Sequence, residues 1–224
     1  MWDEQQYDVS GLSDALIEQQ SLGSLIVSAL DFDLEQKYAK LNDKEFEKMR
    51  IKHNNDRDVY GITTVINFSN RKSHPYLEEI YNYLTNQAKK HVKKDEFKQF
   101  IDMLKTNKIG LFINERYMNL PDILTPKVLK SIPEDIEFTK KQDDIDDPSV
   151  YDFDYFLGIA KWSTDNLYYK PEEERFIDHA SFSFNFSCKT KEGTERYKRI
   201  VYLLKYNTFK QLVENIDDVF TEEK

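Results

Sequence analysis

Strand-like and helix-like patterns of apolar residues alternate along most of this chain, and strand-like patterns dominate its last third. Residues 59–68 (VYGITTVINF) are rich in β-branched and aromatic side chains, which is typical of a buried strand. Residues 180–189 alternate phenylalanine with small polar residues, so we expect a strand with one buried and one wetter face. The sequence predicts strands over residues 25–29, 59–68, 108–113, 153–162, 180–189 and 196–206.

Apolar residues recur at helical spacing between several of these strands. After Pro75, the side chains of Leu77, Ile80, Tyr81 and Leu84 fall on one face of a helix. Residues 59–113 therefore form a strand–helix–helix–strand unit, in which we expect the two strands to run parallel. The helices predicted in this way cover residues 11–20, 76–84, 97–104, 125–132 and 208–216.

The order of these elements predicts the fold class. A turn at 191–194 joins the last two strands into an antiparallel hairpin. An alternating part followed by a hairpin favours the α+β class, with a single mixed β-sheet flanked by helices. We expect one domain over residues 8–220. Two segments depart from the pattern: a charged insertion near 33–57, which is either a solvated helix or a mobile segment, and an acidic stretch near 134–150, which we expect to be a loop.

Acidic residues outnumber basic ones and concentrate around the second of these segments. The chain of 224 residues has a net charge of −9, and residues 134–154 hold nine acids against two lysines, a net charge of −7. This balance argues against direct nucleic-acid binding and favours a basic partner. Asp143, Asp144, Asp146 and Asp147 are the candidate partner-binding residues. A loop that only keeps the protein soluble explains them equally well.

The sequence lacks the usual catalytic and cofactor motifs: it has no P-loop, dinucleotide fingerprint, zincin helix or nucleophile elbow. Its four histidines are far apart, and Cys188 shares the phenylalanine face of residues 180–189, where a buried structural thiol is expected. We therefore expect no enzyme activity, metal or cofactor. One cysteine and the lack of a bilayer-spanning apolar run favour a soluble intracellular protein with no membrane partner. We expect a monomer, because the sequence shows no long apolar seam.

Opposite charges follow directly after the predicted strand at 108–113. Glu115 and Arg116 are costly at the end of a buried strand unless they are paired. In the structural interpretation, which we prefer, Arg116 pairs with carboxylates or carbonyls, and Asn119 caps the turn that ends at Pro121. In the functional interpretation, Glu115 is catalytic and Arg116 binds an anion.

The pattern GL-x-x-x-ERxxNxP, formed by Gly110-Leu111, Glu115-Arg116, Asn119 and Pro121, resembles the signature of the BCCIP family. The resemblance implies a fold similar to that of the GCN5-related acetyltransferases but without the acetyl-CoA site. It also implies a non-enzymatic nuclear chaperone that escorts a basic large-subunit ribosomal protein. Fungal members further support the nuclear export of a phosphatidylinositol phosphate kinase, so nuclear transport factors and shuttling to the cytoplasm are expected as well.

Two alternatives remain beside this expectation. Animal relatives suggest a scaffold in cell-cycle control or DNA repair. Fold analogy alone suggests an acyltransferase-like enzyme that uses acetyl-CoA. Such an enzyme needs glycines and free backbone N–H groups after its central strand to bind pyrophosphate, whereas this chain has Glu115 and two prolines there.

Overall fold

The computed structural model describes residues 9–18, 22–28, 42, 44–45, 58–117, 119–121, 123–143, 145–163, 170–189 and 195–221. The predicted charged insertion at 33–57 lies almost wholly outside these residues, as does the predicted turn at 191–194, so both stay predictions.

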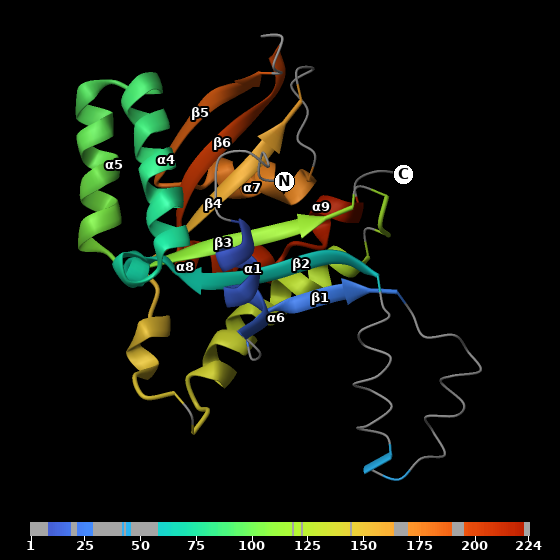
Figure 1. The fold of residues 1–224 in the computed structure, drawn as a ribbon. Helices are drawn as coiled ribbons and strands as arrows, with labels where there is room; N and C mark the ends of the chain where they lie inside the picture. The colour runs from blue at the N-terminus through green and yellow to red at the C-terminus, as the bar shows by residue number, and fades with distance from the viewer. Residues whose placement is uncertain are drawn as a thin grey trace.

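The strands of the described residues form one mixed sheet of six, in the order β1-β2-β3-β4-β6-β5 (Figure 1). Only β3 and β4 run parallel in this sheet; the other neighbouring strands are antiparallel. The predicted α+β class with a single mixed sheet is confirmed. The strands are β1 (Ser24–Val27), β2 (Val59–Asn67), β3 (Ile109–Arg116), β4 (Tyr155–Trp162), β5 (Phe182–Lys189) and β6 (Glu195–Lys205).

Helices cover both faces of this sheet. Alternate side chains of a strand enter opposite layers of the core: Leu111 and Ile113 pack with α4 and α5, whereas Phe112 packs with α6 and α8. Among the described residues, no helix has both the length and the apolar composition needed to cross a membrane. The helices are α1 (Val9–Glu18), α4 (Pro75–His91), α5 (Lys94–Thr106), α6 (Leu124–Thr139), α7 (Pro171–Asp178), α8 (Tyr206–Glu214) and α9 (Asp218–Thr221), with the 3-10 helices η1 (Phe68–Ser73) and η2 (Pro148–Tyr151).

The prediction that the strands of the 59–113 unit run parallel was wrong. Strands β2 and β3 are antiparallel, with Asn67 opposite Gly110 and Gly61 opposite Arg116. The unit contains two helices. Helix α4 leads the chain away from the end of the sheet where β2 stops, and α5 returns it to that same end (Figure 1). The next strand must therefore start beside the end of β2. A single crossover helix would have given the parallel pair.

The prediction of an acidic loop near 134–150 was wrong for residues 134–139, which belong to α6. Leu129, Ile132 and Ile136 are buried at helical spacing, so the apolar face of α6 continues through the acidic residues and through Pro133. The segment from Lys140 to Asp147 is irregular where it is described, and η2 follows it. We call residues 140–154 the α6–β4 connector.

Candidate functional site

The parallel strands β3 and β4 are paired over only a short length. Their register runs from Ile109 opposite Tyr155 to Leu111 opposite Leu157, and both strands continue beyond it without pairing to each other. The two ribbons diverge visibly in Figure 1. We call the space between them the β3–β4 opening. It holds the predicted signature residues of β3 on one side and the start of α7 on the other.

Arg116 and Glu172 form a buried ion pair across this opening. The Nη1 and Nη2 groups of Arg116 donate to the two carboxylate oxygens of Glu172, the second over 3.0 Å. Asn114 Nδ2 also donates to Glu172 Oε1 over 2.9 Å, and Thr63 Oγ1 donates to Asn114 Oδ1 over 3.1 Å. The side chains of Arg116 and Glu172 are only 9% and 0% exposed. This fork is the geometry that the structural interpretation predicted for Arg116.

A second charged group, Lys170, lies just before α7 and is also buried. Its ammonium donates to the backbone oxygen of Asn114 and lies 2.6 Å from Glu173 Oε1 and 3.4 Å from Glu115 Oε1. Burial lowers the pKa of Lys170, but the carboxylates of Glu173 and Glu115 outweigh it, so the pKa is raised overall. Lys170 therefore stays positively charged within the opening.

Glu173 is the least satisfied member of this group. Its Oε1 faces Lys170, but Oε2 is buried and accepts no hydrogen bond in the described part of the protein. Burial raises the pKa of Glu173 to about 7, against the partly compensating charge of Lys170. The protonated form of Glu173 is thus far more populated at neutral pH than that of an ordinary glutamate.

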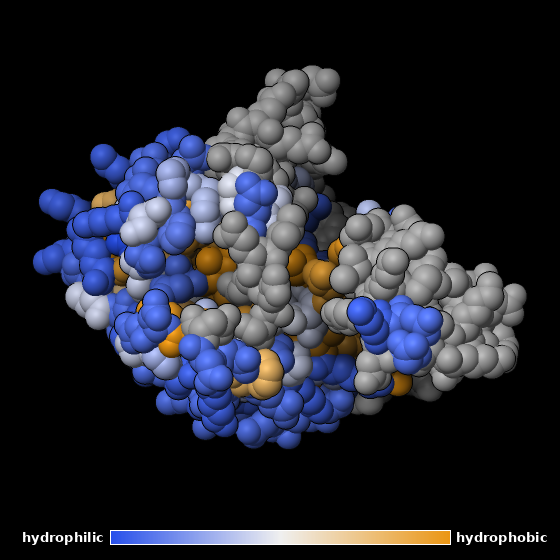
Figure 2. Space-filling model, turned by 60° about the horizontal axis from the view of Figure 1, so that its bottom comes forward, coloured by the Kyte–Doolittle hydropathy of each residue, from blue (hydrophilic) through white to orange (hydrophobic). Residues whose placement is uncertain are grey.

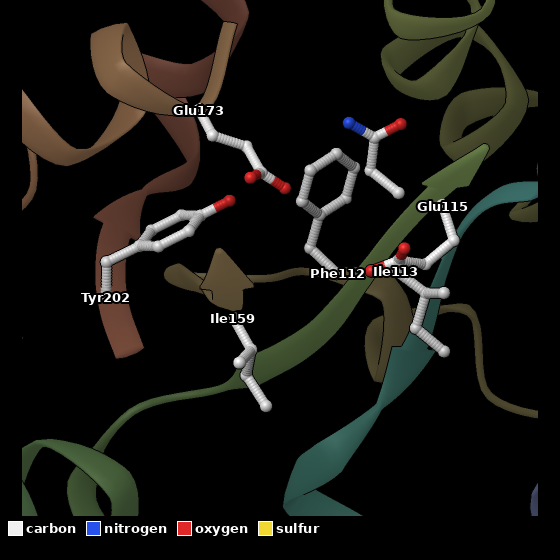
Figure 3. A pocket seen from close by; sticks show the side chains of 7 residues that line it. Phe112, Ile113, Glu115, Ile159, Glu173 and Tyr202 are labelled. Atoms are coloured by element: carbon white, nitrogen blue, oxygen red, sulfur yellow. The ribbon is translucent and has the colours of Figure 1, made fainter. Parts of the chain in front are cut away.

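Glu173 and Tyr202 face each other across a narrow cavity inside the opening, and Figure 3 shows the carboxylate pointing toward the phenol. Burial, followed by the charge of Glu173, raises the pKa of Tyr202 well above its ordinary value. The Tyr202 ring lies directly over Gly158 of β4: a Cβ at that position would stand 2.1 Å from the ring's Cζ. The cavity is lined by Phe112, Ile113, Asn114, Glu115, Ile159, Glu173 and Tyr202.

The remaining signature residues lie at the surface, after the end of β3. The Tyr117 amide donates to Tyr60 O over 2.9 Å, and the Leu120 amide to Tyr117 O over 3.4 Å, which forms a turn. Asn119 and Pro121 are exposed. The capping hydrogen bond predicted for the Asn119 side chain is absent from the described residues; Asn119 instead lines a shallow pocket with Tyr60 and Tyr117.

The structure does not bring the predicted acidic residues to the signature residues. Lys108, just before β3, donates from its ammonium to Ser149 O over 2.9 Å and from its amide to Asp154 Oδ2 over 2.8 Å. The α6–β4 connector therefore lies at the start of β3, whereas Glu115 lies at its end. The extended strand from Lys108 to Glu115 rises by roughly 23 Å, and this distance separates the connector from Glu115.

Within the acidic stretch, some carboxylates are engaged and others are not. Asp147 Oδ1 accepts the Ser149 amide over 3.0 Å and so caps η2, and Lys140 pairs with Asp152 over 2.7 Å. Glu134, Asp143 and Asp146 are exposed and make no hydrogen bond or ion pair with the described residues. Asp144 lies outside those residues.

Sequence reasoning missed Lys170, Glu172 and Glu173, which fill the β3–β4 opening. The available signal was Lys170-Pro171 followed by three glutamates, since proline and acidic residues favour the first turn of a helix. Acidic residues at a helix start are usually solvated, and only the fold shows that two of these three point inward.

Comparison with known proteins decides the family. The family model described as BCCIP matches residues 1–207. The chain belongs to the BCCIP family. The resemblance predicted from Glu115-Arg116 and its neighbours is thereby confirmed.

Relatives of this BCCIP-family chain are found in animals and fungi. "Protein BCCIP homolog" of Drosophila melanogaster is 27% identical over 191 residues, covering 80% of this chain and 59% of the relative. "Protein bcp1" of Aspergillus fumigatus is 23% identical over 223 residues, covering 88% and 67%. The crystal structure of BCP1 from Saccharomyces cerevisiae matches with a TM-score of 0.47 and 20% identity, covering 71% of this chain and 62% of that one. The chain thus spans only about 59% of the Drosophila protein.

Proposed function

We propose that this BCCIP-family chain is a non-enzymatic chaperone or adaptor that escorts a basic partner protein in the nucleus. The partner we propose is a large-subunit ribosomal protein, and a further proposed role is to support the export of a phosphatidylinositol phosphate kinase. Family membership and the net charge of −9 support an acidic escort of this kind. Such an escort masks the positive surface of its client until RNA competes for it.

The observation that carries this proposal is the set of carboxylates left without partners at the end of α6 and in the α6–β4 connector. Glu134, Asp143 and Asp146 are exposed and make no contact that would neutralise them within the described residues. Hydrophilic side chains cover much of this side of the molecule (Figure 2). Exposed, unpaired carboxylates attract a basic protein at long range and steer its approach.

The content of the β3–β4 opening supports a non-enzymatic role. We propose that the divergence of β3 and β4 is the feature in which this fold is similar to the GCN5-related acetyltransferases. Glu115, Glu172 and Glu173 lie in the opening, and the Lys170 ammonium and the Arg116 fork are already engaged by these carboxylates. A pyrophosphate would meet negative charge rather than free donors there.

Binding of a basic client at two salt concentrations tests the proposal. A tagged full chain should retain a basic ribosomal protein from a nuclear extract at low salt and lose it at high salt, because exposed charges are screened. Asp143→Lys with Asp146→Lys should weaken this capture. Asp102→Lys with Glu214→Lys is the matched control, since it changes the net charge equally at exposed positions on α5 and α8.

Equal capture by both double variants would remove the connector from the binding surface. Recovery of cell-cycle or repair proteins in place of a ribosomal protein would favour the scaffold alternative. Thermal stabilisation of the chain by saturating acetyl-CoA would contradict the non-enzymatic proposal and reopen the acyltransferase alternative.

A further inference from the structure

A solvent-open hollow is lined by residues of η1, of the start of α4 and of the end of α5. These segments meet at one end of the α4–α5 pair (Figure 1). Its empty volume is about 800 Å³, a figure that includes open solvent at its mouth. This region is separate from the signature residues at the far end of β3, and it lies near the start of β3, where the α6–β4 connector also lies. The hollow is lined by Ser69, Arg71, Lys72, Glu78, Tyr81, Leu104, Lys105 and Asn107.

Arg71 is the buried charge of this hollow. The residue is only 8% exposed, and its guanidinium stacks over the Tyr81 ring at 4.3 Å from the centroid, with the Phe68 ring at 6.0 Å. The Glu78 carboxylate lies 4.0 Å from Nε, which is beyond hydrogen-bond distance. Arg71 makes no hydrogen bond through its side chain to any residue in the described ranges. Five N–H donors are therefore held in a fixed position, with a large part of their bonding capacity unused.

The other cations of the hollow are also available. Lys72 and Lys105 are exposed and make no ion pair with described residues. Of the polar groups around them, Ser69 Oγ accepts the Ile109 amide over 2.8 Å and Asn107 Nδ2 donates to Met103 O over 2.9 Å, whereas Glu78 Oε2 is buried and accepts no hydrogen bond within the described residues. What the hollow offers a ligand is therefore positive charge, on a chain that is acidic as a whole.

From these observations we infer that the Arg71 hollow binds a phosphate group, either free or as a monoester. Three cations against the single carboxylate of Glu78 leave a local charge of +2. A phosphate monoester carries a charge of about −1.5 to −2 at pH 7 and several acceptor oxygens, whereas a carboxylate carries only −1. An arginine fork matches phosphate oxygens in pairs, and flexible lysines complete the charge. Glu78 lies nearest Nε, so the phosphate binds at Nη1 and Nη2.

The test is a titration of the ¹⁵N-labelled full chain with inorganic phosphate, followed by NMR at constant ionic strength. Amides of residues 69–81 and 104–107, together with the Arg71 side-chain Nε–H, should shift and saturate. A phosphoserine peptide, run in parallel, distinguishes the source of the phosphate: tighter binding of the peptide assigns the site to a phosphorylated partner, and equal binding assigns it to free phosphate. Either result supports the site, whereas equally tight binding of acetate would overturn it.

Variants locate the effect without depending on the buried arginine alone. Arg71→Gln should abolish saturation, and Lys105→Gln should weaken binding about tenfold, the loss of one charge-assisted contact. Lys98→Gln is the matched control, because Lys98 is exposed on the same helix but does not line the hollow. Shifts that never saturate, or that weaken equally in Lys98→Gln and Lys105→Gln, would show only non-specific attraction and would refute the inference.

Discussion

Two arginines of this protein are buried in opposite ways. Arg116 places both Nη groups on the Glu172 carboxylate, which also receives Asn114. Arg71 is similarly buried, yet its nearest carboxylate oxygen is 4.0 Å away and an aromatic ring is its main neighbour. The first guanidinium bonds to another element of the fold, while the second keeps donors free. The difference separates a group that holds the fold together from a group that is available to a ligand.

The largest expected effect is the loss of the Arg116 pair. Arg116→Ala leaves the Glu172 carboxylate buried without its main partner, and we expect the free energy of unfolding to fall by about 4 kcal/mol. Urea denaturation of the variant and the parent measures this difference. Arg116→Met with Glu172→Met is the control, because removing both charges together should cost much less than removing one.

Unchanged stability of the Arg116→Ala variant would show that the Arg116 pair does not hold the fold together, which would contradict the comparison of the two arginines. If that variant also failed to retain a nuclear partner, the signature would be a recognition site rather than a structural one.

The sequence predicted the strands well because their signal is local. The alternating phenylalanines of β5 and the β-branched run of β2 report which faces are buried, whatever the neighbouring strands are. The antiparallel direction of β3 against β2 was missed. It depends on the end of the sheet to which the two intervening helices bring the chain back, and local periodicity carries no information about that. The length of α6 was missed because acidic composition outweighed the spacing of Ile132 and Ile136.

Only part of the candidate site could be predicted, again because the sequence signal is local. Glu115 and Arg116 stand out in the sequence, since charges at the end of a buried strand need partners. Their partners follow more than fifty residues later, and Lys170 and Glu172 meet them only because β3 and β4 part. Sequence reasoning could predict that Arg116 is paired but could not name Glu172.

A smaller effect should appear as a dependence on pH. The pKa of Glu173 is about 7 in the folded protein, against 4.5 as its ordinary value. The folded state therefore keeps a proton that the unfolded state releases, so ionisation of Glu173 makes the fold less stable as the pH rises from 4.5 to 7. The loss is complete above pH 7 and reaches about 3 kcal/mol at most.

Glu173→Gln isolates this contribution from the other titrating groups. The variant should gain stability relative to the parent between pH 4.5 and 7, and urea denaturation across that range measures the gain. If the free energy of unfolding changed with pH in the same way for the two proteins, Glu173 would not keep its proton in the β3–β4 opening.

The smallest expected effect is the most discriminating one. Arg71→Met replaces a stacked guanidinium by an apolar side chain of similar length, and the Tyr81 ring can still pack against it. Since Arg71 has no hydrogen bond to lose within the described residues, we expect the free energy of unfolding to change by less than about 1 kcal/mol without phosphate. Added phosphate should stabilise the parent but not the variant, because only the parent binds it in the folded state. A loss as large as that of Arg116→Ala would instead make Arg71 part of the scaffold, and the two arginines would no longer differ in kind.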